Sequence, residues 1–189
     1  MLDLSNLRPD PAALRTPFEG LICCFARRFP PEEGATFNWI AGAGGDGGLE
    51  AYWTTPAGDE VGYQAKFHRS SGEVDWSKID ASVSAVLTSH PRLTRYVVAL
   101  ACDLTDEVPG RRGKSGRAHW RDHKAKWETD ALARNMSVAF ELWDLSEIED
   151  RLTQSCAQGL RSYWLGELEL TRCLIPAFDG AMFSMEWKE

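Results

Sequence analysis

The chain lacks the sequence features that identify membrane-spanning, secreted and disulfide-stabilised proteins. It has no uninterrupted apolar run of about 18 residues and no charged-then-apolar leader, so neither a membrane span nor a secretory signal is visible. The five cysteines form no Cys-x-x-Cys pair and lie mostly within apolar runs. An odd number of such cysteines fits reduced core thiols better than a disulfide framework, so we expect a cytoplasmic protein.

Histidine is also scarce, which limits the metal sites that the sequence can build. There are only four histidines in the chain. His119 and His123 have the spacing of two ligands on one helix face, but no third ligand is evident in the sequence. The pattern therefore argues against a zinc site.

The chain also lacks a net positive charge. Its formal charge of −7 is unfavourable for binding nucleic acid. Residues 111–126 are the exception, with seven basic residues and one acidic residue, a local charge of +6 that leaves −13 for the remainder. This segment predicts a phosphate-binding patch, and the alternative is a solvated loop and helix face. Its cations are Arg111, Arg112, Lys114, Arg117, Arg121, Lys124 and Lys126.

What the sequence does contain is the pattern of an α/β domain. Apolar residues make up 43% of the chain and charged residues 26%, as in an ordinary globular protein. The run 95–102 is almost continuously apolar, so we expect a central strand that is buried on both faces. Capping residues and apolar spacing predict helices over 16–29, 75–87, 118–134 and 146–158, and strands over 35–40, 49–53, 61–67, 95–102 and 138–143.

Polar residues on two successive strands form the candidate site. Glu50 lies at the start of the run 49–53, and Gln64 and Lys66 share one face of the run 61–67 because strand side chains alternate. The link between these runs contains Pro and Gly and is typical of a hairpin, which would place Glu50 near Gln64 and Lys66. Such a group could bind a divalent cation, hold an attacking water and stabilise phosphate charge. The alternative is a solvated strand face.

A second carboxylate is expected near this group, because Gln64 carries no charge. Glu19 is the best candidate, since the Thr16-Pro17 pair predicts a helix start and Glu19 lies in the first turn, beside the apolar stripe. Favourable electrostatics at a helix N-terminus would also explain an acid at this position, so both interpretations of Glu19 stay open.

Phe18-Glu19, the glycine loop 44–50 and Gln64-Ala65-Lys66 resemble the Mrr-like branch of the PD-(D/E)xK nuclease superfamily. This branch includes the amino-terminal effector nucleases of bacterial antiviral STAND-type NTPases. Further similar segments at 75–80, 90–96 and 102–106 extend the resemblance from residue 15 to about 165. It implies a restriction-endonuclease-like core, in which a mixed central sheet is flanked by helices, and a Mg²⁺-dependent DNA endonuclease that acts in antiphage defence and can use Mn²⁺ instead.

The resemblance also implies roles for individual residues. Glu50, Glu19 and Gln64 would bind the metal, and Lys66 would position the water and stabilise the transition state. Glu50 stands where most relatives carry Asp, and Gln64 replaces the acid of the third motif. Asp46 is therefore an alternative or additional metal ligand and catalytic residue, unless it only forms a turn in the glycine loop.

For domain organisation, we expect a nuclease-like domain over residues 1–165 and an apolar C-terminal extension over 166–189. The extension would lead into a further domain or form an oligomer contact. The expected partners are DNA, taken to be double-stranded, and either further copies of the chain or a fused NTPase or sensor domain, with no membrane partner. Two alternatives stay open: a nuclease-like module without cleavage that binds nucleic acid or mediates assembly, and a nuclease selective for branched DNA or RNA.

Overall fold

The computed structural model describes residues 4, 7–9, 16–40, 47–107 and 113–165. Asp46, Arg111, Arg112 and the predicted extension over 166–189 lie outside these described residues.

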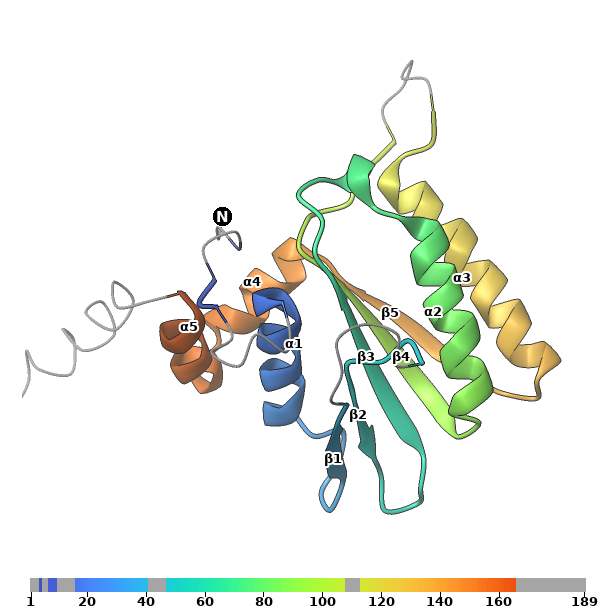
Figure 1. The fold of residues 1–189 in the computed structure, drawn as a ribbon, viewed down its shortest axis with the longest axis horizontal. Coiled ribbons are helices and arrows are strands. Elements are labelled where there is room, and N and C mark those ends of the chain that lie inside the picture. Colours follow the sequence, from blue (N-terminus) through green and yellow to red (C-terminus); the bar gives the residue numbers. More distant parts are fainter. Residues whose placement is uncertain (1–3, 5–6, 10–15, 41–46, 108–112, 166–189) are drawn as a thin grey trace, which may run out of the picture.

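The centre of the fold is a five-stranded mixed sheet in the order β1-β2-β3-β4-β5 (Figure 1). The strands are β1 (Thr36–Trp39), β2 (Ala51–Thr54), β3 (Glu60–Lys66), β4 (Leu93–Leu100) and β5 (Ala139–Trp143). The pairs β1–β2 and β2–β3 are antiparallel, whereas β3–β4 and β4–β5 are parallel. The predicted α/β class, the mixed sheet and the hairpin between β2 and β3 are therefore confirmed.

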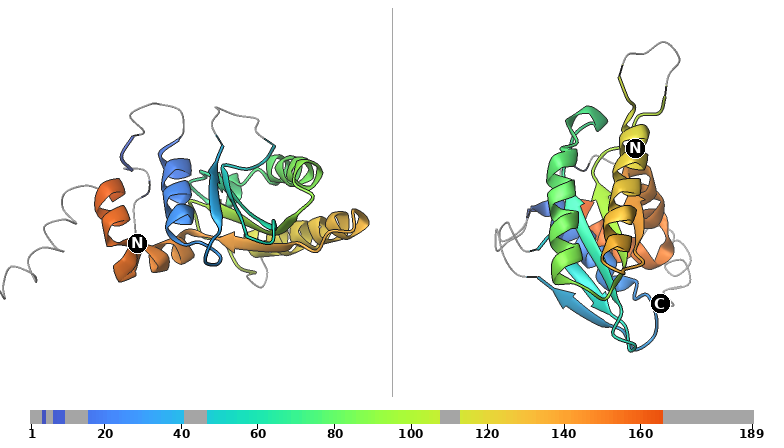
Figure 2. Two further views of the ribbon diagram at one scale, coloured as in Figure 1. Left: turned by 90° about the horizontal axis from the view of Figure 1, so that it is seen from below. Right: turned by 90° about the vertical axis from the view of Figure 1, so that its right-hand side faces the viewer.

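Helices cover both faces of this sheet (Figures 1 and 2). On one face, α2 (Trp76–Ser89) and α3 (Gly116–Ala133) pack on one core, which we call the α2-side core. On the other face lie α1 (Pro17–Arg28), α4 (Leu145–Thr153) and α5 (Gln158–Leu165), which form the α1-side core. Among the described helices, none combines the length and apolar character needed to cross a bilayer.

The helix starts follow their capping residues. Thr16 caps α1 in a capping box with Glu19, and Pro17 occupies the first helical position. Asp75 caps α2 by accepting the Lys78 N–H, and Ser115 caps α3 by accepting the Ala118 N–H. These side chains satisfy backbone donors that would otherwise lack partners, so they fix where each helix begins.

Two expectations about the sheet and the last helix need correction. The single helix predicted over 146–158 is two helices, because Gln154 adopts an extended conformation (φ −62°, ψ 141°) after α4, and a short 3₁₀ turn at Ser155–Ala157 precedes α5. The strand β4 does have strand neighbours on both sides and a buried apolar run, as predicted. The middle strand, however, is β3, because β5 forms the edge beyond β4.

Candidate active site at the carboxyl end of β3

Gln64 occupies an unusual position for an amide side chain, because it is only 1% exposed within the middle strand. It pairs with Val98 of β4, a member of the α2-side core, so strand alternation directs Gln64 to that face. Within the described part of the chain, its Oε1 atom has no hydrogen-bond partner. A buried amide oxygen without a partner costs about 1–3 kcal/mol, which a bound cation or water would offset.

Glu50 lies next to this strand, as the hairpin predicts. It directly precedes β2, and its backbone N–H donates to the Tyr63 carbonyl oxygen at 2.8 Å, beside the residue that precedes Gln64. Burial raises the pKa of the Tyr96 hydroxyl well above its usual range, and the Glu50 carboxylate adds to this effect. The β2–β3 pairing and the backbone hydrogen bond to Tyr63 place the Glu50 backbone against the strand that carries Gln64.

Two glycines set the path of the backbone that leads to Glu50. Gly48 has φ +84°, and a Cβ atom there would overlap the backbone carbonyl of Ser82 in α2. The Tyr96 hydroxyl donates to the Gly48 carbonyl oxygen. In β3, a Cβ atom at Gly62 would meet the Leu49 side chain at 2.5 Å. The close approach of this loop to α2 and β3 therefore fixes the backbone immediately before Glu50.

Lys66 is the last residue of β3, two positions beyond Gln64 and on the same strand face. Its side chain is partly exposed, and among the described residues no carboxylate lies within ion-pair distance of its ammonium. Burial lowers the pKa of the nearby His68, and the Lys66 charge contributes in the same direction. Lys66 is thus a cation available at the carboxyl end of the strand.

Glu19 lies at the same end of the molecule, but its helix packs on the other face of β3. The Phe18 and Phe67 rings are 6.0 Å apart, so the first turn of α1 adjoins the residue that follows Lys66. The α1 helix contributes to the α1-side core, which places the sheet between this helix and the Gln64 face. The Glu19 carboxylate accepts the Thr16 N–H at 2.9 Å in the capping box. This contact uses one of the two carboxylate oxygens of Glu19, so a metal would have to bind the other oxygen or displace the contact.

The basic segment shows a different pattern from Lys66, because each described cation in it is paired with a carboxylate. Apart from the Arg117 pair, whose Asp144 carboxylate is buried, these pairs are at least partly exposed and contribute little stability, so a phosphate could displace them. All of them lower the net charge that the patch presents. The pairs and their nitrogen–oxygen distances are Lys114–Asp122 (2.6 Å), Arg117–Asp144 (3.3 Å), Arg121–Glu107 (2.7 Å), Lys124–Glu128 (3.8 Å) and Lys126–Asp80 (2.8 Å).

His119 and His123 have a structural explanation within the described part of the chain. Both imidazoles stack against the Trp76 indole, with centroid distances of 6.1 and 5.1 Å. The His123 Nδ1 atom lies 2.8 Å from the Asp80 carboxylate, which also accepts the Trp127 indole N–H at 2.7 Å. These residues join α2 to α3. No group of three or more His, Cys, Asp or Glu side chains suited to a metal ion occurs among the described residues.

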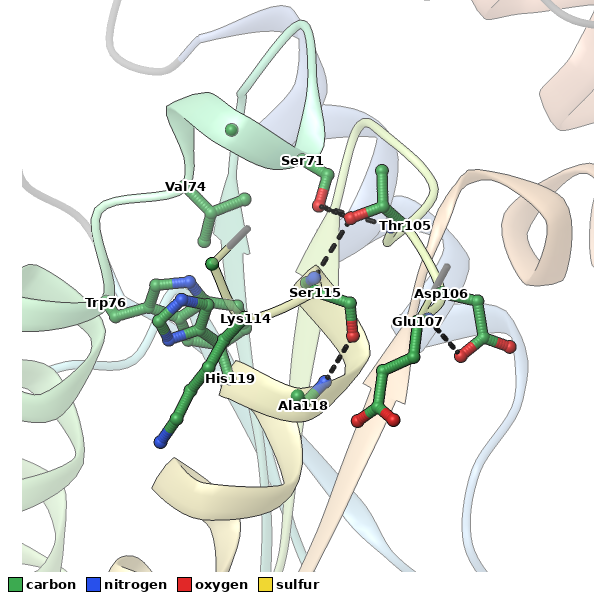
Figure 3. A pocket seen from close by; sticks show the side chains of 13 residues that line it. Ser71, Val74, Trp76, Thr105, Asp106, Glu107, Lys114, Ser115, Ala118 and His119 are labelled. Carbon is green, nitrogen blue, oxygen red and sulfur yellow. Dashed lines mark hydrogen bonds between the residues drawn. The ribbon is translucent and has the colours of Figure 1, made fainter. Parts of the chain in front are cut away.

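One large cavity was not anticipated from the sequence. It has a volume of about 870 Å³ and lies between the loops that follow β3 and β4 and the first turn of α3 (Figure 3). Its lining residues come from three separate segments, so no single sequence motif could indicate it.

Comparison with known proteins adds no family assignment. A scan against protein-family models found no match, and a search of curated proteins found none either.

Proposed function

We propose that this chain is a metal-dependent endodeoxyribonuclease domain with a restriction-endonuclease-like core, acting as an effector in antiphage defence. The observation that carries the proposal is the buried amide oxygen of Gln64, which has no partner within the described chain. Gln64 lies next to Glu50, the residue just before β2, and two residues before Lys66, which has no ion-pair partner among the described carboxylates. A strand interior rarely retains an orphaned polar atom without a reason. A ligand at this position would supply one.

The residues fit Mg²⁺ or Mn²⁺ better than a softer metal. Gln64 supplies an amide oxygen and Glu50 a carboxylate, and hard cations are commonly held by one or two carboxylates together with several waters. Asp46 could complete the set, and Glu19 could do so if its carboxylate reaches past the sheet edge from the α1 face. When bound, the ion would activate water and polarise the phosphodiester for hydrolysis.

Lys66 would act on the scissile phosphate. As negative charge develops on the phosphate oxygens, a fixed ammonium at the end of β3 would stabilise it and could also hold the attacking water. The cations of the basic segment would contact the DNA backbone: Arg111, Arg112, Lys114, Arg117, Arg121 and Lys124. Of these, Lys114, Arg117, Arg121 and Lys124 would exchange their carboxylate partners for phosphates.

The test is cleavage of supercoiled plasmid DNA with Mg²⁺, Mn²⁺ or EDTA, at protein concentrations high enough to allow self-association. We expect metal-dependent nicking or linearisation that is lost in Lys66→Ala and Glu50→Ala. Lys78→Ala is the matched control, since its side chain is 79% exposed and paired only with Asp75 among the described carboxylates. Equal cleavage by the wild type and both site variants would refute the assignment.

A second candidate function is an assembly or nucleic-acid-binding module that does not cleave. It is favoured by the position of Glu19 on a helix that packs on the sheet face opposite Gln64, which leaves Glu50 as the only predicted carboxylate ligand beside Gln64 in the described chain. Retained oligonucleotide binding with no plasmid cleavage by the wild type, even after induced oligomerisation, would support this candidate.

A further inference from the structure

The large cavity lies outside the residues used in the proposed cleavage site, but at the same edge of the sheet. Lys66 ends β3, and Ser71 on the following loop lines the cavity. The five residues of chain from Lys66 to Ser71 span at most about 18 Å. This distance is close to the length of five nucleotides along one DNA strand. A strand cut near Lys66 could therefore extend into the cavity.

An aromatic wall forms one side of this cavity (Figure 3). Trp76 and His119 both line it, with their rings 6.1 Å apart and inclined by 20°. His123 stacks under Trp76 at 5.1 Å and is itself bonded to Asp80, so the indole is held in place before any ligand binds. Aromatic surfaces of this kind bind unstacked nucleobases.

Three hydroxyl residues, Ser71, Thr105 and Ser115, line the cavity, and they leave hydrogen-bond donors available. The Ser71 and Thr105 oxygens are 3.3 Å apart, Ser71 accepts the Thr105 N–H, and Thr105 accepts the Gly116 N–H. Whichever hydroxyl donates to the other, one hydroxyl hydrogen remains. Ser115 accepts the Ala118 N–H, and its own hydroxyl hydrogen has no acceptor among the described contacts. Two hydroxyl hydrogens of lining residues are thus not used in the described contacts, and hydroxyls of this kind donate to the carbonyl or ring acceptors of a nucleobase.

The same contacts argue against a free phosphate as the ligand. The first N–H groups of α3 are already bonded: Gly116 to the Thr105 hydroxyl, Arg117 to the Thr105 carbonyl and Ala118 to Ser115. The helix terminus therefore offers no free donors of the kind that bind phosphate. The charged lining residues are Asp106, Glu107 and Lys114, so two carboxylates face one ammonium group. This lining suits an uncharged base more than a phosphate group.

We propose that this cavity receives an unstacked nucleobase of the DNA strand bound at the cleavage site, which makes DNA with single-stranded character the preferred substrate. This inference rests on the proposed nuclease function. A base drawn from an intact duplex must first be unpaired and unstacked at a cost of a few kcal/mol, so single-stranded, branched or damaged DNA would bind more readily.

The first experiment measures binding in EDTA by fluorescence anisotropy, so that cleavage is not required. The probes are a short labelled single strand, its duplex, and a single strand of the same length whose nucleotides are all abasic. We expect the intact single strand to bind about tenfold more tightly than the abasic strand. Trp76→Ala should remove this difference, Trp76→Phe should retain most of it, and Trp39→Ala, a partly exposed Trp on β1, should leave it unchanged.

A second variant covers the case in which Trp76→Ala disturbs the α2-side core. Gly72 lines the cavity, and a Cβ atom there meets nothing within 4 Å, so Gly72→Trp should fold and obstruct the site. Gly159→Trp on α5 is the matched control, because Gly159 is equally open. We expect only Gly72→Trp to abolish the preference for the intact strand over the abasic strand.

The outcomes separate this inference from the nuclease assignment. Equal binding of intact and abasic strands by the wild type would overturn the inference, whether or not Lys66-dependent cleavage occurs. A Trp76-dependent preference without any plasmid cleavage would keep the nucleobase site and reject the nuclease. Effective competition by free dTMP at concentrations similar to those of the single strand would instead identify a mononucleotide site and also overturn the inference.

Discussion

Replacement of Asp80 should reveal how strongly α2 and α3 are held together. Its carboxylate accepts the Trp127 indole N–H at 2.7 Å and lies 2.8 Å from both His123 Nδ1 and Lys126 Nζ. Trp127 is only 1% exposed, so Asp80→Ala leaves a buried N–H without its acceptor. That loss alone costs about 1–3 kcal/mol.

For a chain of this size, 1 kcal/mol corresponds to a shift of roughly 2–4 °C in melting temperature. A loss of about 2 kcal/mol should therefore lower the melting temperature by about 4–8 °C, as measured by circular dichroism. Asp80→Asn should retain most of the stability, because its amide oxygen still accepts from Trp127. Lys126→Ala should have a small effect, since the Lys126 side chain is 58% exposed.

Equal melting temperatures for the wild type and Asp80→Ala would refute this account of the helix pair. An equally large loss in Asp80→Asn would show that charge, and not the indole hydrogen bond, dominates. Urea unfolding of the same variants would show whether the difference persists as a free energy of unfolding.

Three further predictions concern pH, the glycine loop and the first helix. Partial burial raises the pKa of Asp80, but hydrogen bonds from Lys126, His123 and Trp127 outweigh this effect, so the net pKa is lowered. The wild type should therefore lose stability as the pH falls below about 4 and Asp80 becomes protonated. Asp80→Asn should lose less stability over the same acid titration. Gly48→Ala should destabilise the fold by more than about 1 kcal/mol in urea, because φ is +84° and Ser82 leaves no space, whereas Gly72→Ala should be nearly neutral. Thr16→Ala should cost about 1 kcal/mol of stability yet leave cleavage intact, because it removes only the helix cap. Glu19→Gln should reduce cleavage if Glu19 binds metal. Unchanged cleavage in both variants would exclude Glu19 from the site.

Local signals in the sequence were sufficient for most of the fold. Thr16-Pro17 and Asp75 predicted two helix starts correctly because side-chain capping depends on neighbouring residues alone. The strand alternation that placed Gln64 and Lys66 on one face is equally local. The predicted start of α3, at residue 118, is two residues later than the observed start at Gly116. Ser115 lies within a run of small and charged residues, and it can be recognised as the helix cap only from the backbone that follows it.

The properties that depend on tertiary contacts could not be read from the sequence. The complete burial of Gln64 follows from its position beside β4 on the sheet face that the α2-side core covers. The cavity exists because the Ser71 and Thr105 hydroxyls and the Gly116 N–H tie three distant segments together. A Cβ atom at Gly116 would overlap the Ser71 hydroxyl, so even this glycine has a reason that appears only in the folded chain.

The most direct test of the central claim is the initial rate at which excess protein nicks supercoiled plasmid in Mg²⁺, compared between the wild type and Lys66→Ala. Loss of a group that stabilises transition-state charge typically lowers such rates by about 10²–10³-fold. We predict metal-dependent nicking by the wild type and a loss of that size in Lys66→Ala, with Lys78→Ala unaffected. Nicking that persists in EDTA, or that proceeds at the same rate in Lys66→Ala, would contradict the proposed active site.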